Sequence, residues 1–122
     1  MEEKNKTGER RKFTRVVLDA YITATLTIDK APQERLFMSK DIGPEGIFLV
    51  NNESFPLGTI FKLRIHTPTT SKPIDVEAKV IRIQKDENSQ VMGMGLAFTQ
   101  IKETDKKELL RHLYLAYHYV KP

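Results

Sequence analysis

The sequence contains no cysteine among its 122 residues. This absence excludes disulfide bonds, catalysis by a thiolate and zinc sites built on cysteine, and it is compatible with a reducing cytoplasm. No apolar run approaches the length of roughly 20 residues that a membrane-spanning helix needs. Residues 1–6 lack the apolar core of a secretory signal. We therefore expect a cytoplasmic protein that does not insert into a membrane.

Recognisable catalytic patterns are also missing. The sequence has no phosphate-binding P-loop, no serine in a nucleophile elbow and no carboxylate pair in a familiar catalytic frame. The histidines His66, His112 and His118 do not have the spacing of metal ligands. His112 and His118 are six residues apart, which places them on different faces of a helix. We predict a binding module that has no catalytic activity, no metal and no cofactor of its own.

The composition is that of an ordinary soluble domain, with 39% hydrophobic and 30% charged residues. The net charge of +4 is unevenly distributed, because residues 1–15 contain six basic and three acidic side chains. A protein that binds nucleic acid more often spreads its basic charge over a face. The local excess favours a small anion as ligand, and a solvated basic tail is the alternative interpretation.

Most of the chain alternates with the period of a β-strand. The pattern predicts a strand from Val16 to Ile28, a turn over 29–33 around Pro32, and a second strand region over 35–50 that is interrupted at 41–46. Three more strands are expected over 61–66, 74–83 and 91–98. Turns are expected over 56–58 and 86–89.

Two details refine the expected strands. The alternation slips at Val80, which predicts a bulge or bend after which Ile81 and Ile83 face inward. In the last strand we expect one apolar face, formed by Met92, Met94, Leu96 and Phe98.

The C-terminal region has helical spacing instead, from Thr104 as the expected N-cap to about Tyr119. Residues 1–8 are expected to be a flexible arm, and residues 9–122 a single domain. The predicted fold class is mainly β: a small antiparallel barrel of about six strands with a C-terminal α-helix.

Two short segments contain the candidate binding residues. The first, over 9–15, concentrates guanidinium groups immediately before the first strand, and the second, over 41–46, places Asp41 in a turn with Gly43 and Gly46. Arginine matches phosphate and the O6/N7 edge of guanine, and a carboxylate accepts from the N1–H and N2–H₂ groups of guanine. Taken separately, the segments are also explained by a basic tail and by an ordinary turn.

Taken together, these segments and the order of strands and helix resemble the PilZ domain family of bacterial cyclic di-GMP receptors. The family motif R-x-x-x-R, often preceded by a further arginine, corresponds to Arg10, Arg11 and Arg15. The motif D/N-x-S-x-x-G corresponds to Asp41, with Gly43 in place of serine, and Gly46. The run Gly93–Phe98 looks like the family's last barrel strand.

The resemblance implies a role for each of these residues. Arg11 and Arg15 would hold phosphate and guanine, Asp41 would accept hydrogen bonds from a guanine, and the glycines would let the turn approach the base. Arg10 occupies the position that the family associates with two stacked nucleotides, which implies cyclic di-GMP bound as an intercalated dimer. The ligand would order the arm against the barrel and change a surface that faces an effector protein, in the control of motility, biofilm or exopolysaccharide.

Gly43 departs from the family pattern, because glycine offers the ligand no hydroxyl. One neutral hydrogen bond contributes about 0.5–1.5 kcal/mol, so we expect binding weaker by roughly two- to tenfold. The first alternative is a PilZ-like protein–protein adaptor that has lost nucleotide binding. The second is a small barrel that binds nucleic acid, which would need aromatic side chains among basic ones on an exposed sheet face.

Overall fold

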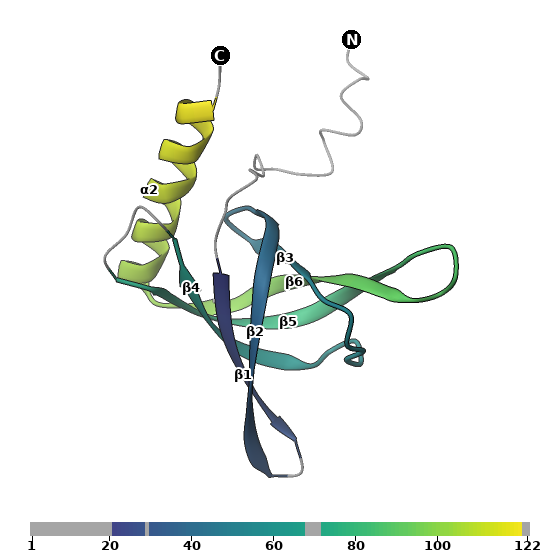
Figure 1. Cartoon of the computed structure of the whole chain (residues 1–122). Coiled ribbons are helices and arrows are strands. Elements are labelled where there is room, and N and C mark those ends of the chain that lie inside the picture. The colour runs from purple at the N-terminus through teal and green to yellow at the C-terminus, as the bar shows by residue number, and fades with distance from the viewer. Residues whose placement is uncertain (1–20, 29, 68–71, 121–122) are drawn as a thin grey trace.

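The computed structural model describes residues 21–28, 30–67 and 72–120. Six antiparallel strands close into a barrel in the order β1-β2-β3-β6-β5-β4, and one helix follows them (Figure 1). This confirms the predicted fold class. The elements are β1 (Tyr21–Ile28), β2 (Ala31–Ile42), β3 (Gly46–Val50), β4 (Ile60–His66), β5 (Ile74–Lys85), β6 (Val91–Ile101) and α2 (Glu103–Val120).

The barrel interior is filled by the inward-facing residues of each strand. In β4, for example, Phe61, Leu63 and Ile65 are buried while the residues between them are exposed. Phe37, Phe55 and Phe61 pack edge-to-face, with ring centroids 5.1–6.5 Å apart. Because apolar burial contributes about 25 cal/mol per Å², this continuous interior is the main source of stability.

The turn predicted over 29–33 is shorter in the structure. β1 ends at Ile28 and β2 begins at Ala31, so Pro32 belongs to a strand and pairs with Thr27. Lys30 has φ of 66°, the left-handed conformation that a two-residue hairpin loop requires. Proline is tolerated here because it lies near the beginning of the strand.

The predicted bulge in β5 is confirmed. Val80 pairs with Leu96 and Arg82 pairs with Gly95, so Ile81 has no partner in the register. The predicted facing of Ile81 was wrong, because its side chain is exposed and only Ile83 packs against the core. Met92, which was predicted to share a face with Met94, Leu96 and Phe98, is exposed, because this end of the β5–β6 ribbon extends past the barrel core (Figure 1).

Helix α2 begins at Glu103, before Thr104, so the N-cap prediction was wrong. The Lys106 N–H already donates to the Lys102 carbonyl oxygen (2.8 Å). Leu109, Leu113 and His112 are buried where the helix packs near β5. Within the described residues no helix is long and apolar enough to cross a membrane.

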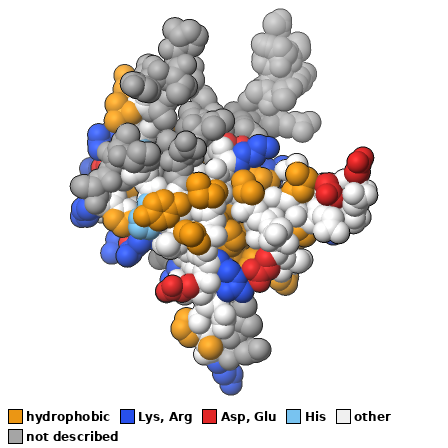
Figure 2. Space-filling model, in the orientation of Figure 1, with side chains coloured by type: hydrophobic (Ala, Val, Ile, Leu, Met, Phe, Trp, Pro, Cys, Tyr) orange, Lys and Arg blue, Asp and Glu red, His pale blue; other side chains and the backbone are white. Residues whose placement is uncertain are grey.

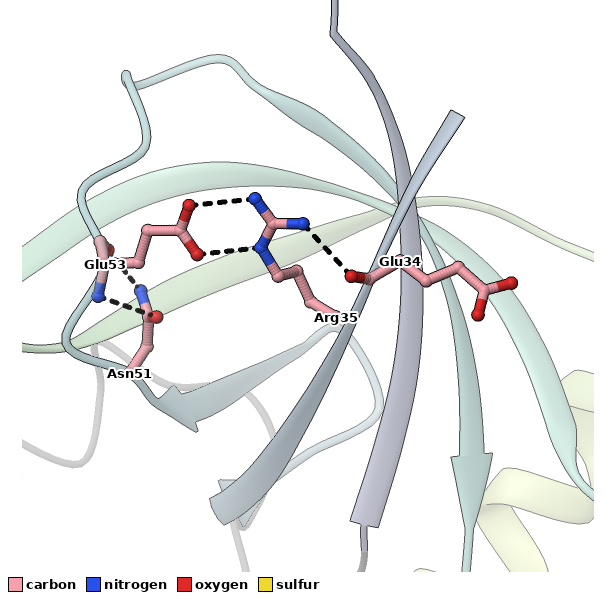
Figure 3. A network of polar contacts seen from close by, with 4 residues as sticks. All are labelled: Glu34, Arg35, Asn51 and Glu53. Carbon is pink, nitrogen blue, oxygen red and sulfur yellow. Dashed lines mark hydrogen bonds and ion pairs between the residues drawn. The ribbon is translucent and has the colours of Figure 1, made fainter. Parts of the chain in front are cut away.

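A polar network fastens the connection between β3 and β4 to the barrel (Figure 3). Arg35 donates from Nε and Nη2 to the Glu53 carboxylate (2.8 and 2.9 Å) and from Nη1 to the Glu34 carbonyl oxygen (3.0 Å). The bond from Arg35 holds the pKa of Glu53 below its usual value. The Asn51 side chain donates to the Glu53 carbonyl oxygen and accepts from its N–H (2.6 and 3.0 Å).

Candidate functional site

The turn between β2 and β3 brings three of the predicted site residues together. Asp41 lies near the end of β2, and the Gly43 N–H donates to the Gly46 carbonyl oxygen (2.9 Å). Gly46 begins β3 and pairs with Ala97 of β6. The turn is therefore tied both to itself and to the last strand, which gives Asp41 a fixed position. The other predicted site residues, Arg10, Arg11 and Arg15, lie outside the described residues.

A local irregularity in β2 decides which way Asp41 faces. Ser39 pairs with Leu49, whose side chain is in the core, whereas Asp41 pairs with Phe48, which has the opposite facing. Two residues of a regular strand separated by one position share a face. The register shift at Lys40 breaks this rule, so Asp41 is directed to the outer surface of the barrel.

Phe48 forms the floor beside Asp41. It lies outside the core cluster, yet its side chain is only 5% exposed. The Arg82 Cζ lies 5.3 Å from the centroid of its ring, and the Lys40 Nζ lies 5.6 Å from it. The aromatic ring and the two cations therefore form one cluster next to the carboxylate. Cations over an aromatic face are held by the charge distribution of the ring.

The glycines of β6 make this arrangement possible. A Cβ atom at Gly93 would collide with the Phe48 ring, and a Cβ at Gly95 would lie 3.3 Å from the Arg82 Nε. The ring and the guanidinium therefore lie against bare backbone. The earlier interpretation of Gly93–Phe98 as a barrel strand is confirmed, and its two glycines have the additional effect of flattening the outer face.

The N-terminal end of β1 lies close to this site. Tyr21, the first described residue, pairs with Met38, which precedes Asp41 by three residues on β2. Tyr21 thus lies roughly 10 Å from Asp41 along the strand direction, given the rise of about 3.3 Å per strand residue.

An apolar row borders the site on the outer surface. Met38 pairs with Val50, one row along from the Asp41–Phe48 pair, and both side chains are about half exposed. Tyr21, on the other side of Met38, is also exposed and stacks on the His66 ring (centroids 4.4 Å apart). Hydrophobic side chains cross the middle of the face shown in Figure 2.

Lys40, Phe48 and Arg82 were not predicted to be neighbours of Asp41. The signal that points to them is the spacing of Gly93 and Gly95, which share one face of a strand and leave it bare. What the sequence does not provide is the register that sets Phe48 and Arg82 against them. The described residues contain no group of three His, Cys, Asp or Glu side chains that is able to hold a metal ion.

A closed barrel of six antiparallel strands with a C-terminal helix is the architecture of the PilZ fold. The family model described as PilZ domain matches residues 9–115, and the chain therefore belongs to the PilZ domain family. Proteins of this family are regulatory cyclic di-GMP binders. A comparison with curated proteins finds no match.

Solved structures of the family superpose on this chain. The inhibitor of motility MotI/DgrA from Bacillus subtilis does so with a TM-score of 0.76 and 25% identity, covering 93% of this chain and 54% of that protein. The PilZ domain of YcgR from Escherichia coli, solved with cyclic di-GMP, has a TM-score of 0.65 and 15% identity over 90% of this chain and 93% of that domain.

The complex of K. pneumonia MrkH with cyclic di-GMP has a TM-score of 0.68 and 17% identity, covering 92% of this chain and 56% of that protein. The chain thus spans about half the length of MotI/DgrA and of MrkH.

Proposed function

We propose that this protein is a cyclic di-GMP sensor or adaptor without catalytic activity, in which the ligand orders the N-terminal arginines against the barrel. Family membership and neighbours solved with cyclic di-GMP support the ligand class. The observation that carries the proposal for this chain is the position of Asp41. Its carboxylate lies on the outer face, on the strand that pairs with the beginning of β1.

In this proposal the two ends of the ligand meet opposite charges. Asp41 accepts hydrogen bonds from one guanine, while Arg11 and Arg15 bind phosphate and guanine through their planar forks. Arg10 adds a third guanidinium, which favours two stacked nucleotides and thus an intercalated dimer. Gly43 and Gly46 leave room for a base at the turn.

Binding then changes the surface beside the site. The arm would close over the Asp41–Phe48 row, and the exposed row of Tyr21, Met38 and Val50 adjoins it. Ligand binding would in this way increase the population of the conformation whose surface an effector protein recognises. Motility and biofilm control are the proposed settings, and a cytoplasmic location suits a bacterial second messenger.

Gly43 favours a second function, a PilZ-like adaptor that works by protein–protein contact without nucleotide. The turn backbone uses the Gly43 N–H internally, in its bond to the Gly46 carbonyl. This position therefore offers the ligand neither a hydroxyl nor a free N–H. The outward carboxylate of Asp41 favours the receptor.

Isothermal titration of the full chain with cyclic di-GMP tests the proposal. We expect saturable binding, a stoichiometry near two nucleotides per chain for the dimer, and a loss of at least about tenfold in Arg11→Ala, Arg15→Ala and Asp41→Ala, since bonds to charged groups contribute about 1.5–3 kcal/mol. Arg64→Ala is the matched control, because Arg64 is paired with Asp75 on other strands.

Absence of heat at high micromolar ligand would reject the receptor and leave the adaptor. Equal affinity in wild type and all three site variants would instead show that the nucleotide binds elsewhere on the protein. Unfolding of the arginine variants, followed by circular dichroism, would assign them a structural role.

A further inference from the structure

One arginine of the barrel differs from the others that the structure describes. Arg35, Arg64 and Arg111 each pair with a carboxylate, on Glu53, Asp75 and Glu108 respectively. Arg82 makes no such ion pair within residues 21–28, 30–67 and 72–120, and its only described side-chain interaction is with the Phe48 ring. An arginine without a carboxylate partner keeps its five N–H donors for another acceptor.

The register places this arginine in line with the candidate carboxylate. Asp41 pairs with Phe48, Phe48 with Gly95, and Gly95 with Arg82, so one row crosses the outer faces of β2, β3, β6 and β5. The two ends of this row are about 14 Å apart, at roughly 4.8 Å for each strand spacing. The Arg82 guanidinium lies over Gly95 of β6, with Cζ 5.3 Å from the ring centroid of Phe48, the residue that pairs with Asp41.

Three features hold the guanidinium in that place. Gly95 has no side chain in the path, and a Cβ there would lie 3.3 Å from Nε and 3.4 Å from Nη2 of Arg82. The bulge at Ile81 sets the facing of Arg82, since it moves the register between Val80 and Arg82. The Phe48 ring then supports the cation. A preorganised donor loses less entropy when a ligand binds.

We infer that Arg82 is a ligand-binding residue of this site, and that it holds a guanine of the nucleotide through the O6/N7 edge from the barrel side. The inference rests on the proposed function. An arginine fork matches the two acceptors of guanine, and the Lys40 ammonium on the same ring adds positive charge for the phosphates. The described barrel thus supplies both an anionic and a cationic contact for the nucleotide.

The test is titration of cyclic di-GMP into full-length wild type, Arg82→Ala, Arg82→Lys and Gly95→Ala. We expect Arg82→Ala to weaken binding about tenfold or more, because a bidentate contact with guanine has an effect of that size. Arg82→Lys keeps the charge but lacks the fork, so it should bind nearly as weakly. Gly95→Ala changes no charge and should weaken binding by displacing the guanidinium.

Arg64→Ala, which removes an equal charge from another strand, should bind as wild type does. If wild type binds and Arg82→Ala stays within twofold of it, the inference is overturned and the receptor stands. Wild-type affinity in Arg82→Lys would overturn the guanine contact. If wild type does not bind at all, the receptor proposal itself fails. Should Arg82→Ala not fold, Arg82→Lys and Gly95→Ala decide the question.

Discussion

At the scale of single residues, the site depends on where side chains are absent as much as on where they are present. Phe48 faces outward and is still buried, because Gly93 and Gly95 let its ring and the Arg82 guanidinium lie against the backbone of β6. Asp41 faces outward only because Lys40 is bulged. Neither effect can be read from the motif D-x-G-x-x-G, because a motif gives residue types and their spacing but not the side of the sheet to which each side chain points.

Gly43 provides a test at this scale. Among the described glycines only Gly58 has a positive φ, so the backbone at Gly43 accepts a side chain without conformational strain. Gly43→Ser restores the hydroxyl of the family motif, and we expect it to tighten cyclic di-GMP binding by roughly two- to tenfold, the effect of one neutral hydrogen bond. Titration calorimetry measures this change.

Gly43→Ala is the control, because it adds a carbon atom and no hydroxyl. An equal gain in both variants would attribute the effect to backbone stiffening and not to a new hydrogen bond. Weaker binding in Gly43→Ser than in wild type would show that this glycine is needed for close approach.

At the scale of elements, helix α2 carries the buried histidine of the described chain. His112 is 2% exposed, and its Nε2 lies 3.2 Å from the Glu108 carboxylate, which Arg111 also contacts (2.8 Å). Burial lowers the pKa of His112, and the attraction of Glu108 opposes this only in part. The helix therefore packs on the barrel with this imidazole neutral.

This lowered pKa predicts how stability depends on pH. The unfolded chain binds a proton at His112 first, near its ordinary value of about 6.5, so the stabilisation is present above that pH and is lost as the pH falls below it. Glu108, whose pKa is lowered chiefly by its hydrogen bond from Arg111, loses its contribution only at lower pH, below about 4.3. We expect the urea concentration at the unfolding midpoint of wild type to decrease when the pH is lowered from 7.5 to 5.5. The midpoint of His112→Gln should change less over the same pH range.

Leu113→Val is the matched control on the same buried side of the helix. It should lower the midpoint at every pH by a similar amount, about 1 kcal/mol in free energy, because it removes a methylene and leaves His112 in place. Parallel pH profiles for wild type and His112→Gln would assign the pH dependence to other groups.

At the scale of the whole molecule, the barrel and its helix were predictable because the alternation of apolar and polar residues follows local geometry. Phe61, Leu63 and Ile65 show the period of two, and all are buried. The turn around Pro32 was predicted too long, since hairpin pairing overrides a local turn signal. The row from Asp41 to Arg82 was not predictable, because it depends on two register shifts and on the pairing of β3 with β6, which are distant in sequence.

A ligand that binds only the folded protein should stabilise all of it. At a free concentration 100 times the Kd, one bound cyclic di-GMP should add about 2.7 kcal/mol to the free energy of unfolding, and a second bound nucleotide should increase this value. Thermal unfolding, followed by circular dichroism with and without the nucleotide, measures the shift. Asp41→Ala should show a smaller shift at the same nucleotide concentration, and GMP at that concentration is the control for unspecific effects.

The closed hydrogen-bonding circuit of the barrel has a consequence for communication. Within the barrel each described strand has a neighbour on both sides, so unpaired edges remain only where two hairpins extend past it. Residues 31–37 of β2 pair with β1 alone, and residues 81–85 of β5 pair with β6 alone. Of the described strands, only these two ribbons could therefore accept a strand from another protein, and the rest of the wall presents side chains.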